Sequence, residues 1–359
     1  MAIKFFDVRE QYLDNQHTID TGVNIALATG KYFSDLEHTD LAKMISFRYN
    51  DAPVTLTNSG TSALITALTA LDLRKGSYVL MPTMTYAATA QAVLAVGCQP
   101  EFVDIDEHYL MDTKELKKSF DRFRPNISAV IAVDLYGQGS NIDELLPFCR
   151  DRKIPLVIDA AQSFGMTSMG YDQTMADAVC LSFNPLKNWG GIGGGAVVSK
   201  KINPNKLRAI THCGKDEHGE LRYHGGNYRM DSIQAAVLNQ KMEYCWDMDV
   251  RKLYIDNVYR EAFSDIMPRL TPWNKNRRPY VSVIAPQDAA KVRKALSAAN
   301  IEYRSHYDRP LHMESLFRRR SESLPVAESL AGRLISLPNN YHITDDDVYQ
   351  VIDVVKSAL

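Results

Sequence analysis

One lysine in this chain of 359 residues stands in a setting that could make it chemically reactive. Lys187 lies in the segment Ser182-Phe-Asn-Pro-Leu-Lys-Asn188, and the glycine-rich run 190–195 follows it. Pro185 lacks a backbone N–H and biases the residue before it away from helix, so we expect irregular backbone here. The glycines allow left-handed backbone and the close approach of a ligand. A lysine held in such a turn can lose its proton and attack a carbonyl carbon, whereas a lone surface lysine would stay solvated.

A second stretch has the pattern of a phosphate-binding turn. The short run Val54-Thr-Leu-Thr57 leads into Asn58-Ser-Gly-Thr-Ser62, and an apolar helix is predicted from Ala63 to Leu71. A strand, a small polar turn and a helix start together point free N–H groups and the positive end of the helix dipole at an anion. The hydroxyl groups of the turn would add donors. The same residues would also serve as an ordinary helix cap, and the pattern alone does not choose between the two.

Short apolar runs alternate with helical segments along most of the chain. Strands are predicted at 54–57, 78–81, 101–105, 129–133, 156–159 and 179–183. This alternation is typical of an α/β fold with a mostly parallel central sheet and helices on both faces. Functional residues of such sheets gather at the carboxyl ends of the strands. The residues at those ends are Ser59 to Ser62, Tyr86, Tyr136, Asp159, Ser182 and Lys187.

The length of the chain suits two domains. We expect residues 1–240 to form a large domain with an N-terminal arm, and residues 241–359 to form a smaller C-terminal α/β domain. The smaller part opens on a long helix and contains a predicted strand at 280–284 and a predicted helix at 289–299. A closing helix over 345–359 is initiated by Thr344.

Composition excludes several classes of partner. The net charge of −2 gives no electrostatic reason to expect nucleic acid or an anionic membrane surface, and no apolar run approaches the ~20 residues of a membrane span. Five scattered cysteines without a C-x-x-C pair fit a reducing cytoplasm, and the N-terminus lacks the apolar stretch of a signal peptide. We expect no metal, although His212, Cys213 and His218 lie close together in sequence. The basic run Arg318-Arg-Arg320 is expected on a solvated face.

The residues collected at the strand ends together suit pyridoxal phosphate. This cofactor requires a lysine for its Schiff base and a carboxylate that keeps the pyridine nitrogen protonated, so that the ring can accept electrons. It also needs donors for its phosphate and a flat partner for its ring. No Walker pattern, Rossmann G-x-G-x-x-G or Ser-His-Asp spacing competes, because the glycines after Lys187 begin a strand and not a helix.

Nine segments with characteristic residues follow one another in order along nearly the whole chain. They are Gly30-Lys-Tyr-Phe33, Ser59-Gly-Thr-Ser-Ala63, Pro82 to Thr89, Phe102-Val-Asp-Ile-Asp106, Leu135-Tyr-Gly-Gln138, Asp159-Ala-Ala-Gln162, Ser182 to Asn188, Asn227-Tyr-Arg-Met-Asp-Ser-Ile-Gln-Ala235 and Pro310-Leu-His312. In these segments the chain resembles the DegT/DnrJ/EryC1/StrS family of sugar aminotransferases, which have the fold of the type I pyridoxal-phosphate-dependent transferases. The order and spacing of the segments together make the resemblance specific.

The resemblance implies a role for each residue of the site. Lys187 would form the internal aldimine, and Asp159 would pair with the pyridine nitrogen. Gln162 would reach the phenolic oxygen of the ring, and Tyr86 would stack on the ring face. The remaining cofactor-binding residues are Gly60, Thr61 and Ser182 at the phosphate, Asn227 from the neighbouring subunit of a homodimer, and Ser62 and Asn184 beside them.

Three further residues are candidates for the substrate side, namely Tyr136, Arg229 and His312. Each prediction has a plain alternative. A strand-end acid such as Asp159 can cap a helix, Tyr86 can be a core residue, and His312 can be a structural histidine. Asn227 follows two glycines and can be a turn residue.

Two features depart from the family pattern, and both concern the substrate pocket more than the cofactor site. The turn after the lysine, Ile192-Gly-Gly-Gly-Ala196, lacks the acid that relatives usually carry. Asp134 stands before Leu-Tyr-Gly, where relatives often have Asn or His. Some relatives are dehydratases with histidine in place of the lysine, and Lys187 argues against that branch.

The sequence therefore predicts an aminotransferase that moves an amino group from an amino acid, by resemblance glutamate, to a ketone on a nucleotide-linked deoxysugar. A free cyclitol or another small keto compound remains an alternative acceptor. A lyase or dehydratase with the same cofactor would share the site but need no amino donor. A regulatory protein of the same fold without catalysis is a further class, which the intact lysine, acid and phosphate-binding set disfavours.

Overall fold

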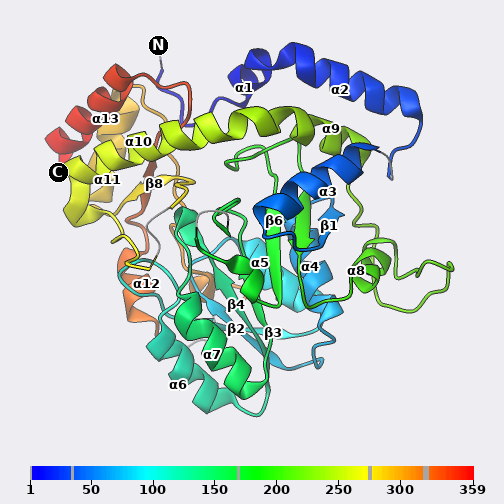
Figure 1. The fold of residues 1–359 in the computed structure, drawn as a ribbon. Helices are drawn as coiled ribbons and strands as arrows, with labels where there is room; N and C mark the ends of the chain where they lie inside the picture. The colour runs from blue at the N-terminus through cyan, green and yellow to red at the C-terminus, as the bar shows by residue number, and fades with distance from the viewer. Residues whose placement is uncertain (1, 34–35, 168–169, 274–276, 318–322) are drawn as a thin grey trace.

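A seven-stranded sheet forms the centre of the computed structural model, which describes residues 2–33, 36–167, 170–273, 277–317 and 323–359 (Figure 1). The strands are β1 (Val54–Thr57), β2 (Tyr78–Pro82), β3 (Gln99–Val103), β4 (Ile127–Val133), β5 (Leu156–Asp159), β6 (Ala178–Ser182) and β7 (Gly195–Val198). They lie in the order β1-β7-β6-β5-β4-β2-β3. β7 is antiparallel to both β1 and β6, and the other neighbours are parallel. The mostly parallel sheet predicted from the sequence is confirmed. The Arg318–Arg320 run lies outside the described residues.

Helices cover both faces of the sheet, which explains why its strands are continuous apolar runs. Successive residues of β4 point to opposite faces, so that Ile131 joins one buried cluster and Val130 and Ala132 join the other. The first cluster contains residues of α4 (Gly60–Ala70), α5 (Ala87–Ala95) and α8 (Pro204–Thr211). The second contains residues of α3 (Leu36–Arg48), α6 (Thr113–Phe123), α7 (Ile142–Arg152) and α9 (Ser232–Lys241).

One strand lies earlier in the chain than its pattern predicts. The sequence places a strand at 101–105, whereas β3 begins at Gln99, which pairs with Tyr78 of β2. Pro100 has no N–H to donate to a neighbouring strand, so the sequence pattern argues against a strand at this position. β3 is the last strand of the sheet, and an edge position accommodates a proline because one side of the strand needs no ladder partner.

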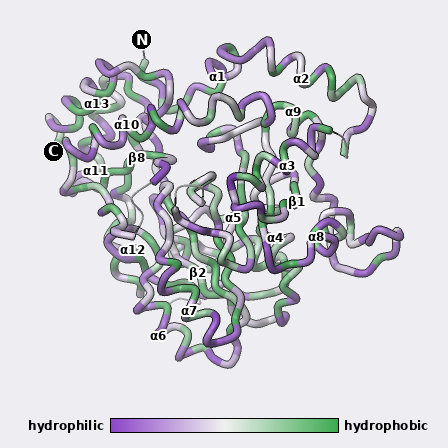
Figure 2. Tube along the Cα trace, viewed as in Figure 1, coloured by the Kyte–Doolittle hydropathy of each residue, from purple (hydrophilic) through white to green (hydrophobic). Residues whose placement is uncertain are grey.

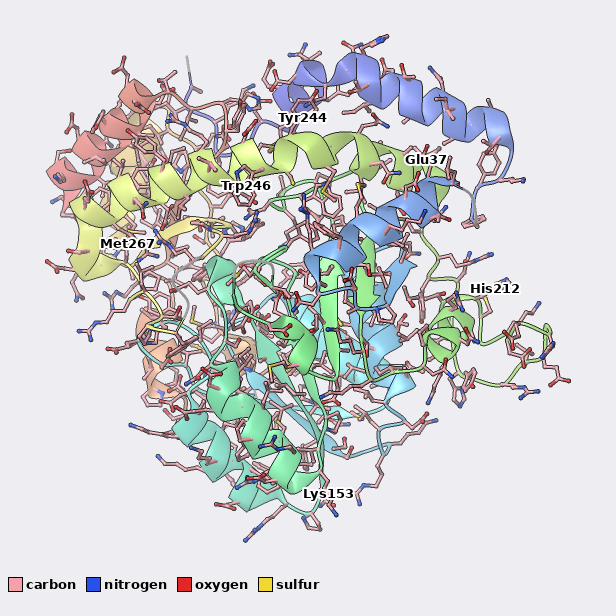
Figure 3. All side chains as sticks on the ribbon, viewed as in Figure 1. Glu37, Lys153, His212, Tyr244, Trp246 and Met267 are labelled. Carbon is pink, nitrogen blue, oxygen red and sulfur yellow. The ribbon has the colours of Figure 1, made fainter. Side chains whose placement is uncertain are left out.

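The N-terminal arm is helical and lies along one side of the molecule. α1 (Val8–Asp14) and α2 (Gln16–Thr29) precede α3, and α2 packs beside α9 (Figure 1). α3 also packs against α9, where Asn239 Nδ2 donates a hydrogen bond of 2.6 Å to the carboxylate of Glu37 (Figure 3). These contacts connect the arm to the helix that follows the loop 212–231.

The C-terminal part is built on the long helix α10 (Cys245–Phe263). Its other elements are β8 (Ser282–Ile284), α11 (Ala289–Ala298), α12 (Pro325–Leu330), β9 (Ile335–Leu337) and α13 (Asp345–Ala358). β8 and β9 pair antiparallel, and a third buried cluster joins α10, α11 and α13. Tyr280 and Leu311 pack instead on the cluster beside the large sheet. The domain boundary near residue 240 stays a prediction.

Hydropathy follows this layering (Figure 2). The strands in the middle of the molecule carry hydrophobic residues, while the loop that projects after α8, with His212 at its base, is mostly hydrophilic (Figures 2 and 3). Within the described ranges, the helices are too short or too polar to cross a membrane. The same part of the chain shows no cluster of three or more His, Cys, Asp or Glu side chains with the arrangement of a metal site.

Candidate active site

A cavity of about 520 Å³ opens at the carboxyl ends of β5 and β6, beside the first turn of α4. Its walls carry most of the predicted cofactor-binding residues. They are Gly60, Thr61, Tyr86, Asp159, Gln162, Ser182, Asn184 and Lys187. A second cavity of about 550 Å³ lies between α4, α5 and the loop after α8, and contains none of the predicted site residues. The edge of the sheet predicted from the strand pattern is therefore where these side chains meet.

The turn that presents Lys187 connects two hydrogen-bonded strands. Ser182 at the end of β6 pairs with Gly195 at the start of β7, so both ends of the turn are held in the sheet. Inside the turn, the Lys187 N–H donates to the Asn184 carbonyl at 2.8 Å. A Cβ at Gly190 would lie 2.5 Å from that same carbonyl oxygen, so glycine is required for the chain to fold back this closely.

Burial changes the acid–base behaviour of the Lys187 amine. It lowers the pKa of Lys187 to about 8, while the nearby Asp159 carboxylate acts in the opposite direction. The Lys187 Nζ lies 4.2 Å from the centroid of the Tyr280 ring, which forms one wall of the cavity. A pKa near 8 leaves an appreciable fraction of the amine neutral at neutral pH. The neutral amine is the form that attacks carbonyl groups and accepts protons.

Asp159 is the last residue of β5 and is 6% exposed. Its Oδ2 accepts a hydrogen bond of 2.8 Å from the Thr89 hydroxyl, and its Oδ1 accepts one of 3.2 Å from the Ala161 N–H. Burial raises the pKa of Asp159, and the two hydrogen bonds and the Lys187 charge oppose that rise. The carboxylate thus faces the cavity from the sheet, with donors that favour its ionised form.

The first turn of α4 has the geometry of an anion-binding cradle. The N–H groups of Gly60 and Thr61 belong to the first turn, where no helical carbonyl can accept from them. A Cβ at Gly60 would lie 2.6 Å from the Ser182 Cβ, so the missing side chain lets the helix start approach the end of β6. Ser62 has a different position from the one predicted. It does not line the cavity, and its hydroxyl donates to Asn58 Oδ1 at 2.6 Å.

Gln162 connects two parts of the cavity wall. Its Nε2 donates to the Tyr307 hydroxyl at 2.9 Å, and its Oε1 accepts from the Tyr136 N–H at 2.7 Å. Tyr136 itself is buried with a left-handed backbone (φ 57°), does not line the cavity, and donates its hydroxyl to the His306 carbonyl. Tyr136 therefore supports the wall from behind.

Tyr86 stands at the cavity mouth and is 62% exposed, which excludes the alternative of a core residue in this chain. Its ring centroid lies 6.1 Å from that of Tyr307. The exposed ring is free to cover a flat ligand, as the resemblance implies.

The structure does not bring the remaining predicted residues to this cavity. Asn227 contacts Asn58 through its backbone carbonyl, which accepts from Asn58 Nδ2 at 3.2 Å. Arg229 lies over the Phe33 ring at 4.4 Å. His312 is buried, and its ring nitrogens contact the Thr83 hydroxyl at 2.7 Å and Glu328 at 3.2 Å. His312 thus has the contacts of a structural histidine, which was one of its two predicted readings.

Asp134, one of the two departures from the family pattern, also points away from the cavity. It is fully buried, and its carboxylate accepts hydrogen bonds from the Ser140 N–H and from the side chains of Ser163, Tyr171 and Gln173. Burial raises the pKa of Asp134, and several of these hydrogen bonds lower it. The residue joins the loops that follow β4 and β5, and does not line the described cavity.

Sequence reasoning missed several cavity residues. They are Thr89, Cys180, Tyr280, Ser305, His306 and Tyr307. Thr89 lies one helical turn after Tyr86, and this spacing could have indicated a shared direction. The residues from 280 onward reach the site through tertiary packing, for which the local sequence carries no signal.

Comparisons with known proteins identify the family of the chain. The family model of the DegT/DnrJ/EryC1/StrS aminotransferase family matches residues 15–356. The erythromycin biosynthesis sensory transduction protein EryC1 of Saccharopolyspora erythraea is 28% identical over the full length of both chains. The UDP-2-acetamido-2-deoxy-3-oxo-D-glucuronate aminotransferase of Pseudomonas aeruginosa is 30% identical over 94% of both chains.

Among solved structures, S. venezuelae DesV in complex with a ketimine intermediate is similar with a TM-score of 0.93 and 26% identity. The similarity covers 99% of this chain and 98% of DesV. The match extends from the N-terminal arm to the closing helix, so it includes both the sheet and the C-terminal part. The chain therefore belongs to the DegT/DnrJ/EryC1/StrS aminotransferase family, and is an aminotransferase with the type I fold.

Proposed function

We propose that this aminotransferase uses pyridoxal phosphate to move an amino group from glutamate to a ketone on a nucleotide-linked sugar. The observation that carries the proposal is the single cavity that holds Lys187, Asp159 and the first turn of α4 together. An amine with a lowered pKa, a buried carboxylate and an anion cradle are the three groups that this cofactor requires.

The donor set of the cavity fits the cofactor. The N–H groups of Gly60 and Thr61 and the Ser182 hydroxyl would hold the phosphate, while Asp159 would face the pyridine nitrogen and Tyr86 the ring. When bound, pyridoxal phosphate supplies an electron sink that stabilises negative charge at the substrate carbon. Because Gly60 has no side chain, the first turn of α4 lies close to Ser182, so its N–H groups and the Ser182 hydroxyl can act on the same ligand.

The protein's own contribution to the reaction is proton transfer by Lys187. Its neutral Nζ can accept the proton from the Cα of the amino donor. The protonated Nζ can then return a proton to a carbon atom later in the transfer. Asp159 stays at the far wall and balances positive charge within the site. The Tyr280 ring restricts access of water to the amine.

The choice of acceptor rests on relatives. The Pseudomonas aeruginosa relative is named for a UDP-linked 3-oxo sugar, which supports a nucleotide-linked ketone for this chain. The alternative is a free cyclitol or small keto compound, and the absence of arginine from the cavity walls that the structure describes favours it. A pyrophosphate would then depend on groups outside the described cavity, such as Arg229 or Arg309.

We further propose a homodimer with shared sites. Large apolar side chains stand exposed on the arm and on the projecting loop, among them Leu36, Phe47 and Leu221, with Phe47 77% exposed. Arg229 Nε is buried without a hydrogen-bond partner, which suits a surface that a second copy completes. Asn227 beside it would then act in the partner's cavity. A reducing cytoplasm suits the five unpaired cysteines.

The test is product analysis. Purified protein is incubated with glutamate and a panel of nucleotide-linked ketosugars, with unactivated ketones in parallel, and amination is followed by mass spectrometry. We expect a mass change only with a nucleotide-linked ketone, and no product with Lys187→Ala. Amination restricted to unactivated ketones would replace the acceptor but keep the aminotransferase, whereas product from Lys187→Ala would overturn the mechanism.

A further inference from the structure

A second buried lysine lies behind the wall of the cavity. Lys252 belongs to α10 and is 3% exposed. Its Nζ donates to Asn188 Oδ1 at 2.6 Å and to the Tyr280 carbonyl at 2.8 Å. Both acceptors are uncharged, so this arrangement differs from an ion pair. Burying an ammonium group costs free energy unless hydrogen bonds offset the cost, and here the two acceptors supply those hydrogen bonds.

Asn188 connects the catalytic turn to the wall. It follows Lys187 in the chain, and its Nδ2 donates to the carbonyls of Arg278 and Pro279, each at 3.3 Å. The same amide therefore accepts from Lys252 and donates to the segment that carries Tyr280.

We propose that Lys252 is a positioning residue for the Lys187 amine: it clamps Asn188 and Tyr280 together and so holds the Tyr280 ring against Lys187 Nζ. The proposal rests on the proposed function in one respect, namely that Lys187 is the reacting amine. It adds that the reactivity of this amine depends on a residue of the C-terminal part. Lys252 touches none of the reacting groups, so it acts through Asn188 and Tyr280.

The charge state of Lys252 suits this role. Burial, together with the charge of Lys187, lowers the pKa of Lys252 to about 7. An amine keeps two N–H donors after it loses its proton, so both hydrogen bonds persist in either state. The clamp can therefore operate without a full second positive charge behind Tyr280.

Two titratable side chains beside the Lys187 amine, those of His306 and Tyr280, carry no charge at neutral pH. Burial lowers the pKa of His306 to about 4 and raises the pKa of Tyr280 to about 12, so both side chains are neutral. Asp159 is the charged group that raises the pKa of Lys187 against the effect of burial. The Nζ atoms of Lys187 and Lys252 lie 4.2 and 5.6 Å from the centroid of the Tyr280 ring. Loss of Lys252 releases the clamp, so the Lys187 amine gains contact with water and its pKa rises.

The experiment measures the Lys187 amine without substrate. Cofactor-free protein is labelled with trinitrobenzenesulfonate over a range of pH, and modification of Lys187 is followed by peptide mass spectrometry. We expect the midpoint near pH 8 in the unaltered chain and a rise on the order of one pH unit in Lys252→Met. Thermal unfolding of each variant is recorded in parallel.

The matched control is Lys241→Met. Lys241 is also buried, burial lowers its pKa to about 8, and its Nζ donates to Gln11 Oε1 at 3.1 Å and to the Gly190 carbonyl. It contacts neither Asn188 nor Tyr280 in the hydrogen bonds of the structure. We expect its labelling midpoint to match the unaltered chain, so an equal shift in both lysine variants would overturn the clamp.

A double-mutant cycle tests the route. With the cofactor bound, Lys252→Met and Asn188→Ala should each lower kcat at least tenfold with a smaller change in KM, and the double variant should be no slower than the worse single one. If the kcat losses of the two single variants multiply in the double variant, Lys252 does not act through Asn188. If Lys252→Met does not fold, the midpoint of Asn188→Ala decides, and an unshifted value overturns the proposal. These labelling results stand apart from the aminotransferase test, because they need no substrate.

Discussion

Asp159 is the residue whose chemical form decides what the proposed cofactor can do. The Thr89 hydroxyl and the Ala161 N–H each occupy one of its oxygens, and both hydrogen bonds favour the carboxylate over the acid. Burial acts against them and raises its pKa. Because these effects oppose one another, a change in either one should be measurable in the reaction.

Replacement of Asp159 by asparagine keeps the shape and removes the charge. We expect Asp159→Asn to lower the aminotransfer rate by roughly a hundredfold or more, while cofactor occupancy changes far less, because the electron sink needs a protonated ring nitrogen. Single-turnover kinetics and absorbance of the bound cofactor separate the two. Thr89→Val is the control, which leaves the carboxylate in place and should give a smaller loss. Near-normal turnover of Asp159→Asn with cofactor bound would assign the acid a structural role only.

Buried lysines also make the stability of the protein depend on pH. Burial lowers the pKa values of Lys187 and Lys241 to about 8 and that of Lys252 to about 7, against 10.5 for an ordinary lysine. Between these values the unfolded chain binds more protons, so the free energy of unfolding rises with pH. The contribution is fully present above pH 10.5 and is lost as the pH falls to about 7.

We therefore expect cofactor-free protein to become more stable from pH 7 to about 8.5, measured by urea unfolding. Above that range the buried cysteines act in the opposite direction, since burial raises the pKa of Cys149 to about 12 and also raises that of Cys180 well above its ordinary value. Lys252→Met should reduce the slope. A flat or falling curve in both proteins would contradict the burial of these amines.

At the scale of elements, the start of α4 lies against the end of β6, and this close contact depends on Gly60, which has no side chain. Gly60→Ala would place a Cβ 2.6 Å from the Ser182 Cβ, so the helix start must move away from the strand. We expect a loss of about 1–3 kcal/mol in the free energy of unfolding and weaker cofactor binding.

The compensating change separates these two effects. Gly60→Ala with Ser182→Gly removes the close contact and should recover stability, but not cofactor affinity, because the Ser182 hydroxyl is also lost. Denaturant unfolding and cofactor titration measure the two quantities. Recovery of both would show that the Ser182 hydroxyl does not bind the phosphate.

An element could be predicted where a local sequence pattern specifies it, and could not where its position depends on packing between distant segments. The strand ending at Asp159, the turn of Lys187 and the helix start at Gly60 are local patterns, and the structure has each near its predicted place. Ser62 was assigned to the cofactor, but its hydroxyl bonds to the side chains of Ser59 and Asn58 and does not line the cavity. Tyr307 could not be predicted, because its position depends on how a distant segment packs against the sheet.

Asp134 is a residue for which the sequence suggested a role in the substrate pocket that its side-chain contacts do not support. Its place before Leu-Tyr-Gly suggested a change in the substrate pocket, yet the side chain points into a buried network. A sequence gives the position of a residue along the strand, but not which of two loops its carboxylate will face. Local patterns therefore predicted which strand ends line the cavity, but not which side chains of the following loops turn into it.

At the scale of the whole molecule, the proposed dimer predicts that inactive chains can complement one another. A hybrid of Lys187→Ala with Asn227→Ala contains one cavity with both residues intact. Random mixing of equal amounts should restore about a quarter of the unaltered activity, since half the dimers are hybrids with one working site each.

Each variant measured alone supplies the baseline, and sedimentation gives the state of association. A mixture of Lys187→Ala with itself, labelled in two ways, controls for exchange of subunits without rescue. A fully active monomer, or no rescue when exchange is complete, would show that Asn227 does not serve a partner's cavity.

The walls of the cavity come from widely separated stretches of the gene. Asp159 ends a strand of the central sheet and Lys187 lies in the turn after another strand, while Ser305, His306 and Tyr307 come from the stretch between α11 and α12. Codons for the second stretch can change without altering those for the first. Mutation of a short C-terminal region can therefore reshape one wall of the cavity and leave the other walls unchanged, so duplicated genes can diverge in the shape of this cavity before they diverge at Lys187 and Asp159.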